Sequence, residues 1–247
     1  VPPWITPSRR ALVEVLEKHW LPPELPHIHL TSGGSESVES AVKIALQFHA
    51  ARGEQDRSLI IARSPSYLGP TLATAGLSGH AARKRGLESA LTTYPVVPTP
   101  YPLRCPLGRD SDDMGAWYAQ ALEDAITEAG SGRVAAFLAE PITGSSGGAI
   151  VPPDDYWPRI REICDRHGVL LIMDEVMTGF GRTGRKFGYQ HWDFTPDILV
   201  GGKGLAGGYA PLGGVFASSK IADAIKAAKM NVMFHTFGAH PAACAAA

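Results

Sequence analysis

Six short runs of apolar residues constrain the fold of this chain more than any other feature. They lie at 28–30, where His29 interrupts the run, and at 59–61, 134–138, 169–173, 198–200 and 215–217. A strand that is apolar at every position is buried on both faces, which occurs mainly in parallel sheets with helices on both sides. Segments with helical spacing of apolar residues separate these runs, at 9–20, 36–52, 71–77, 117–129, 156–167 and 221–229. The sequence therefore predicts an α/β fold, with a mostly parallel mixed sheet covered by helices on both faces.

The remaining composition narrows the class of protein. The 247 residues contain no linker that would divide them, so we expect one domain over 1–247, with a long connection at 95–113. A net charge of -1 does not favour nucleic acid or a membrane surface as partner. Three scattered cysteines favour a cytoplasmic protein without a disulfide framework. His27 and His29 have no Cys nearby and only one close carboxylate, so we expect no metal site there.

Ligands of open α/β sheets bind beyond the carboxyl ends of the strands, so the residues at these ends are the candidate site. Gly34 and Ser35 follow the first run and open a helix, where free N–H groups favour a phosphate. A plain tight turn with Ser35 as helix cap fits equally well. Tyr67 follows the second run, where it either stacks on a flat ligand ring or simply packs.

The later runs end at charged residues. Glu140 follows the third run and either faces a ligand or organises the turn. Asp174 directly follows five apolar residues, and a buried carboxylate needs a partner such as a protonated heterocyclic nitrogen or Arg182. Lys203 lies between two glycines, where it is either a loop lysine or, if burial lowers its pKa, a nucleophile for Schiff-base chemistry. An aldehyde cofactor with a phosphate and a pyridine ring would use all of these groups.

Four motifs resemble a known family. They are TSGGSESVE at 31–39, DEVMTGFGRTG at 174–184, GKGL at 202–205 and HTFG at 235–238. Together they resemble the class III (subgroup II) aminotransferases of fold type I, which depend on pyridoxal 5'-phosphate (PLP). The match runs along essentially the whole chain. The stretches 101–108 and 203–212 resemble the branches that use ω-amino acids or amines.

The resemblance implies a role for each candidate residue. Lys203 carries the cofactor and later moves the proton, and Asp174 keeps the pyridine nitrogen protonated. The other implied cofactor contacts are Val176 on one ring face, Tyr67 on the other, Gly34 and Ser35 at the phosphate, and Glu140 near the substrate and the ring hydroxyl. Thr236 is similar to a residue that reaches the cofactor phosphate of the neighbouring subunit, which implies a homodimer. The reaction implied is ping-pong transfer of an amino group from an amine donor to an oxo acid.

The chain also departs from the family pattern. Leu68 stands where the family usually has His, and Thr143 stands where it often has Gln. The family's first segment and its C-terminal small domain, which commonly carries a carboxylate-binding arginine, are not in this sequence. We therefore expect the large domain of a longer chain, which binds PLP weakly and is a poor catalyst by itself.

Three alternatives remain at this stage. The first is another PLP reaction on the same scaffold, such as a decarboxylating transaminase or an aminomutase. The second is a nucleotide-binding domain, which lacks the G-x-G-x-x-G turn and gives Asp174 and Lys203 no role. The third is a non-catalytic fragment that keeps the fold. The main interpretation requires that the side chains of Asp174 and Lys203 reach one common cavity.

Overall fold

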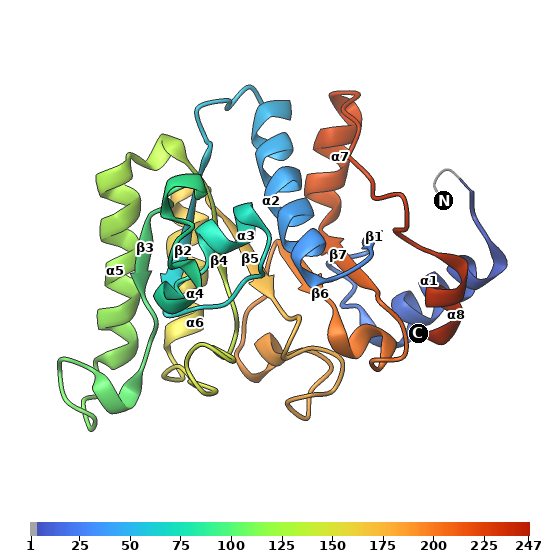
Figure 1. The fold of residues 1–247 in the computed structure, drawn as a ribbon. Helices are drawn as coiled ribbons and strands as arrows, with labels where there is room; N and C mark the ends of the chain where they lie inside the picture. The colour runs from blue at the N-terminus through green and yellow to red at the C-terminus, as the bar shows by residue number, and fades with distance from the viewer. Residues whose placement is uncertain (1–3) are drawn as a thin grey trace.

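The computed structural model describes residues 4–247, which form a mixed seven-stranded sheet in the order β1-β7-β6-β5-β4-β2-β3 (Figure 1). The strands are β1 (His27–Thr31), β2 (Leu59–Ser64), β3 (Val96–Pro98), β4 (Val134–Ala139), β5 (Leu170–Asp174), β6 (Ile198–Gly201) and β7 (Gly213–Ala217). β7 is antiparallel to both of its neighbours, and the pairs from β6 to β3 are parallel. The predicted mostly parallel mixed sheet is confirmed.

Helices cover both faces of the sheet. The helices are α1 (Pro7–Val15), α2 (Gly34–Ala51), α3 (Leu72–Leu77), α4 (Ala81–Lys84), α5 (Met114–Ala129), α6 (Tyr156–His167), α7 (Ser219–Ala227) and α8 (Pro241–Ala246). One apolar core joins the sheet to α1, α5 and α6, and a second joins it to α2 and α7 (Figure 1). In β5, Leu171 and Met173 enter the first core, whereas Leu170 and Ile172 enter the second. The strand is apolar throughout because successive side chains serve opposite cores.

The path from α6 to β5 fixes the position of the strand end that matters most. α6 ends at Gly168, whose φ of 64° is the left-handed conformation that glycine adopts easily. The chain then enters β5 within two residues and runs through the buried sheet to Asp174. A helix stop and an apolar run therefore place this carboxylate at the carboxyl edge of the sheet.

The segment 95–113 differs from its expected form as a simple connection. It contains β3, which pairs with β2 at the edge of the sheet. Only Val97 of this three-residue strand is buried, so the sequence lacks the apolar run that marks the other strands. Proline at its end is compatible with an edge position.

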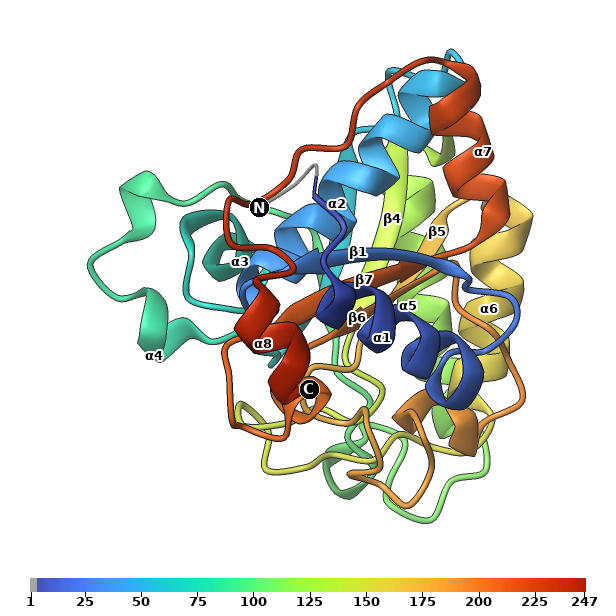
Figure 2. The same ribbon diagram turned by 90° about the vertical axis from the view of Figure 1, so that its right-hand side faces the viewer.

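The C-terminal part of the chain returns to its beginning, since α8 lies beside α1 (Figure 2). The predicted helix at 9–20 is present as α1, followed by a single wider π-helical turn over Leu16–Trp20. Within residues 4–247, no helix is both long and apolar enough to cross a membrane.

Candidate active site

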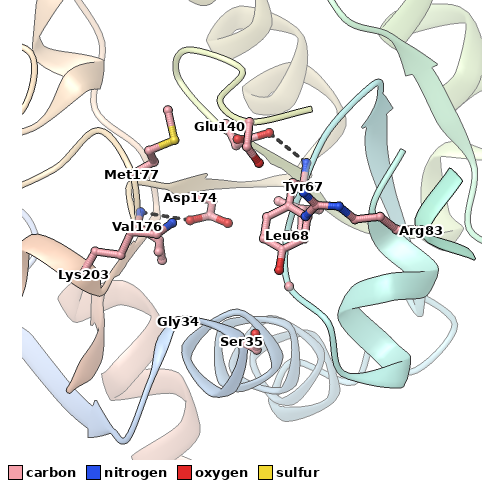
Figure 3. A pocket seen from close by; sticks show the side chains of 12 residues that line it. Gly34, Ser35, Tyr67, Leu68, Arg83, Glu140, Asp174, Val176, Met177 and Lys203 are labelled. Carbon is pink, nitrogen blue, oxygen red and sulfur yellow. Dashed lines mark hydrogen bonds between the residues drawn. The ribbon is translucent and has the colours of Figure 1, made fainter. Parts of the chain in front are cut away.

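A cavity of about 410 Å³ lies at the carboxyl edge of the sheet, next to the start of α2 (Figure 3). Seven of the eight residues singled out in the sequence line it: Gly34, Ser35, Tyr67, Glu140, Asp174, Val176 and Lys203. Asp174 and Lys203 thus reach one common cavity, as the main interpretation requires. Five further residues that the sequence did not single out as candidates complete the lining: Leu68, Gly69, Arg83, Ser145 and Met177.

Asp174 is the buried carboxylate of this cavity, with only 5% of its surface exposed. Its Oδ1 accepts a hydrogen bond from the backbone N–H of Val176 at 3.0 Å. No cation of residues 4–247 lies within ion-pairing distance of it, which excludes the alternative of a salt bridge to Arg182 in this structure. Burial raises the pKa of Asp174 to about 8, and the nearby charge of Glu140 adds to that effect. Such a carboxylate favours a ligand that brings a positive charge or a strong donor.

Glu175, the next residue, has a different environment. It is fully buried, and its carboxylate accepts hydrogen bonds from the Thr178 hydroxyl and from the N–H groups of Gly188 and Tyr189. Burial raises the pKa of Glu175, and these three donors oppose that effect. The side chain therefore fastens the turn after β5 to the following loop, outside the cavity lining.

Glu140 lies between two backbone donors. Its Oε2 accepts from the N–H of Tyr67 at 3.1 Å, and its Oε1 accepts from the N–H of Gly144 at 2.9 Å. Burial raises the pKa of Glu140, whereas these two donors lower it. The carboxylate thus both organises the turn and faces the cavity, so the two roles left open by the sequence coexist.

Lys203 follows β6 and projects into the cavity from the side of Val176 (Figure 3). Its side chain is exposed in this chain, so of the two states left open by the sequence the structure shows the exposed one. Its φ of 37° lies in the left-handed region, which is uncommon for a residue with a side chain and occurs often at functional sites.

Close backbone packing holds this side of the cavity together. A Cβ added to Gly34 would lie 3.0 Å from Val176, and one added to Gly202 would lie 3.3 Å from the same side chain. The start of α2 and the residue before Lys203 therefore both approach Val176 so closely that a Cβ at either glycine would be tightly packed. Across the cavity, Gly69 has a φ of 136°, and a Cβ there would lie 2.5 Å from the Ser35 hydroxyl.

Tyr67 and Arg83 form the opposite wall. The Arg83 guanidinium lies over the Tyr67 ring, 4.7 Å from its centroid (Figure 3). Arg83 belongs to α4, within the basic run 83–85. That run was the only signal for it in the sequence, and it does not indicate which of the three side chains turns inward.

The two departures from the family pattern take part in buried contacts. Leu68 is buried and donates its backbone N–H to the Ser78 hydroxyl at 2.8 Å. The Thr143 hydroxyl accepts from the guanidinium of Arg63, whose side chain is also buried. Arg63 donates in addition to the backbone carbonyl of Glu140, so Thr143 belongs to the support behind that carboxylate.

Thr236 is the one predicted residue that does not line the cavity. It lies between β7 and α8, in a segment with large exposed apolar side chains. Met233, Phe234 and Phe237 are each more than 60% exposed.

Comparison with known proteins identifies the class to which this fold and site belong. The family model described as class-III aminotransferase matches residues 6–247. The chain therefore belongs to the class-III aminotransferase family.

Individual relatives agree with that family. The chain is 37% identical to putrescine–pyruvate aminotransferase of Pseudomonas aeruginosa, over 92% of this chain and 49% of the relative. It is 39% identical to an omega-aminotransferase of Caulobacter vibrioides, over 91% of this chain and 52% of the relative. It thus spans about half the length of the curated relatives it matches.

A solved structure shows the same fold. An amine transaminase from an uncultivated Pseudomonas species, in a PLP-bound form, superimposes with a TM-score of 0.93 at 38% identity. The match covers 99% of this chain and 56% of that structure. The α/β fold is therefore that of the fold type I transaminases, and the alternative of a nucleotide-binding domain is not favoured.

Proposed function

We propose that residues 1–247 are the cofactor-binding large domain of a PLP-dependent aminotransferase. The reaction is transfer of an amino group from an amine or ω-amino acid donor to an oxo acid. The observation that carries the proposal is the common cavity of Asp174 and Lys203, a buried carboxylate and an amine that meet at the carboxyl edge of the sheet. The family membership and the amine transaminase fold support it.

The residues of this cavity fit the cofactor. Asp174 lacks a cation partner among residues 4–247, and burial raises its pKa, so a protonated ring nitrogen would satisfy it. Gly34 and Ser35 begin the 18-residue helix α2, whose first N–H groups suit a phosphate. Val176 and Tyr67 line the cavity on different sides, with room between them for a flat ring.

Bound PLP supplies an aldehyde that bonds to amines and a protonated ring that accepts the charge left when a proton leaves the substrate. Lys203 would provide the amine that holds the aldehyde, and its Nζ would take the proton from the substrate Cα. Asp174 holds the proton on the ring nitrogen. Glu140, fixed by two backbone donors, would face the side of the ring that carries the hydroxyl group. These groups are fixed by the fold before substrate arrives, which is the main source of electrostatic catalysis.

A homodimer in the cytoplasm completes the proposal. Thr236 lies outside the cavity of its own chain, among exposed apolar side chains, which suits a contact with the cofactor phosphate of a second copy. The three cysteines, all buried and free, suit a reducing compartment. The substrate-recognition parts that the family carries elsewhere would come from other segments of the full protein.

Replacing Lys203 tests the proposal most directly. Lys203→Ala should abolish both transamination and the absorbance band of lysine-bound PLP, because no other cavity residue supplies an amine. Lys186→Ala, which removes an exposed lysine outside the cavity, should change neither. Persistence of both signals in Lys203→Ala would show that the assignment is wrong.

Product analysis separates the proposal from its alternatives. With pyruvate and an amine donor, the protein should form alanine and the carbonyl product of the donor, without release of CO₂. Release of CO₂ would indicate a decarboxylating transaminase, and an isomerised amino acid would indicate an aminomutase. PLP binding without any product would indicate a catalytically incomplete protein.

A further inference from the structure

Arg83 is a cation of the cavity that the proposed reaction does not yet use. It lies across the cavity from Lys203, on α4 (Figure 3). Within residues 4–247 its side chain makes no hydrogen bond or ion pair, and its guanidinium contacts the ring of Tyr67, 4.7 Å from the centroid. Its charge is therefore available to a ligand.

The other charged groups of the cavity are already occupied. Both carboxylate oxygens of Glu140 accept from backbone N–H groups. In the proposed function Asp174 faces the ring nitrogen, and Lys203 either carries the cofactor or moves the proton. Among the described residues that line the cavity, Arg83 is the cation with no role in this chemistry, so it can pair with an anion that a substrate brings.

The Tyr67 ring leaves the guanidinium suited to a carboxylate. Stacking uses the flat face of an arginine, whereas its N–H donors point outward in the plane of the group. A carboxylate binds those in-plane donors in a two-point arrangement. The contact with Tyr67 thus restrains Arg83 without using its hydrogen-bonding capacity.

A 2-oxo acid carries a carboxylate beside its reacting carbonyl, and a cation of the cavity would stabilise that carboxylate. We propose that Arg83 binds the carboxylate of the substrate and so selects oxo acids over carbonyl acceptors without a carboxylate. This inference rests on the proposed aminotransferase function. It assigns acid recognition to the large domain itself, at the wall opposite the reactive lysine.

The test compares two amino acceptors in the complete, PLP-loaded protein. Pyruvate carries a carboxylate, propanal does not, and benzylamine serves as donor for both. Arg83→Gln should raise the KM for pyruvate at least about tenfold and leave the KM for propanal within about twofold, since only one acceptor loses a charge-assisted pair. Arg83→Lys should recover part of the loss. Arg85→Gln, an exposed neighbour outside the cavity lining, should alter neither value.

Binding provides a second measurement that does not depend on turnover. Propionate has a carboxylate but no reactive carbonyl, and calorimetry should show its Kd raised at least about tenfold by Arg83→Gln. An unchanged KM for pyruvate and Kd for propionate would overturn the inference. Equal losses with pyruvate and propanal would overturn it as well, since they would indicate that Arg83 only supports Tyr67. A weaker affinity for PLP with an unchanged KM for pyruvate would assign Arg83 to the cofactor phosphate instead.

These outcomes separate the inference from the function on which it rests. Wild-type protein that binds PLP but transfers no amino group to either acceptor would refute the proposed function. Active wild-type protein with unaltered acid preference in Arg83→Gln would refute the inference alone.

Discussion

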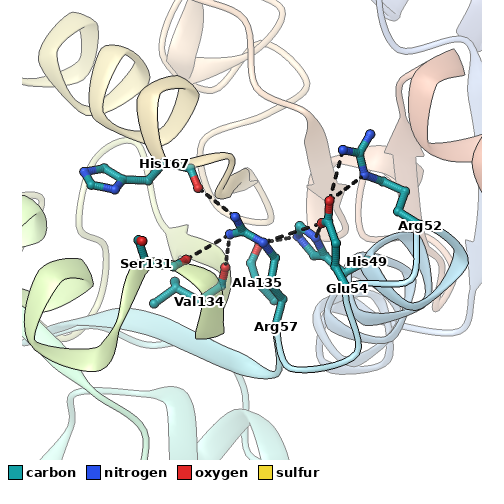
Figure 4. Close-up of polar contacts among 8 residues, drawn as sticks. All are labelled: His49, Arg52, Glu54, Arg57, Ser131, Val134, Ala135 and His167. Carbon is teal, nitrogen blue, oxygen red and sulfur yellow. Dashed lines mark hydrogen bonds and ion pairs between the residues drawn. The ribbon is translucent and has the colours of Figure 1, made fainter.

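Charged side chains at the amino edge of the sheet have partners within the chain, whereas Asp174 at the carboxyl edge has no cation partner among residues 4–247. This difference separates residues that stabilise the fold from residues that can bind a ligand. At the amino edge, Arg57 donates to the carbonyls of Ser131, Val134 and His167 at 2.9–3.1 Å (Figure 4). At the carboxyl edge, Asp174 is buried, yet it has no cation partner among residues 4–247.

The amino edge contains a linked set of such contacts. His49 is buried and bonds to the Glu54 carboxylate and to the carbonyl of Ala135, while Arg52 pairs with Glu54 from outside (Figure 4). Arg57 also lies 3.5 Å from Glu54. These residues tie the end of α2 to the starts of β2 and β4. Charged groups whose hydrogen bonds are made within the folded chain support the fold and have no free donor or acceptor for a ligand.

The carboxyl edge shows the cost of leaving a charge for a ligand. Burial raises the pKa of Asp174 to about 8, which means that the folded chain disfavours its ionised form. A buried carboxylate of this kind attracts a protonated ring nitrogen more strongly than a carboxylate in water would. Sites of this kind reduce stability in exchange for function.

The largest effect should come from removing the unpaired charge. Asp174→Asn should lower kcat about 100- to 1000-fold, as losses of a preorganised charge do. The matched control is Asp197→Asn, since Asp197 pairs with Arg161 and with the N–H of Leu171, both at 2.8 Å. That variant should lower Tm while kcat changes little. If both substitutions reduced kcat alike, the distinction between the edges would be wrong.

A smaller effect is expected from breaking the paired edge. Arg57→Met should lower the free energy of unfolding by about 2–3 kcal/mol, because three carbonyls lose their donor. Denaturant unfolding of the complete protein measures this. Arg52→Met, at a side chain that is 49% exposed, should stay within about 0.5 kcal/mol of wild type. PLP absorbance of the folded Arg57→Met protein should match wild type, and a loss of the band would link this edge to the site.

The smallest effect concerns stability and pH in the cofactor-free protein. The unfolded chain has Asp174 near its ordinary pKa of 3.8, whereas the folded chain raises it to about 8. The folded state keeps this proton up to a higher pH than the unfolded state does. The stability associated with this group is therefore present below pH 4 and is lost as pH rises towards 8. Asp174→Asn should therefore stabilise the cofactor-free protein at pH 8, by about 1–2 kcal/mol, and not at pH 4. Urea midpoints at the two pH values provide the measurement. An equal difference at both would show that Asp174 does not titrate in this window.

The positions of the site residues along the chain could be predicted because they depend on local patterns. An apolar strand such as β5 must be buried on both faces, and parallel strands end at a common edge, so Asp174 and Lys203 could be expected near each other. The sequence could not predict that Lys203 is exposed, because its exposure depends on what surrounds the loop after β6. β3 also escaped prediction, because a short edge strand needs little apolar sequence.

The sequence by itself determined the order along the chain of every strand except β3 and of every helix except α4 and α8, together with the residues that follow the main strands and the family. Those properties follow from the side-chain period and from motifs that each lie within a short continuous stretch of sequence. Only the tertiary structure decided which of two adjacent acids, Asp174 or Glu175, faces the cavity, and that Arg83 rather than Arg85 completes it. Such choices depend on hydrogen bonds and stacking with residues distant in the chain, and no local pattern records them.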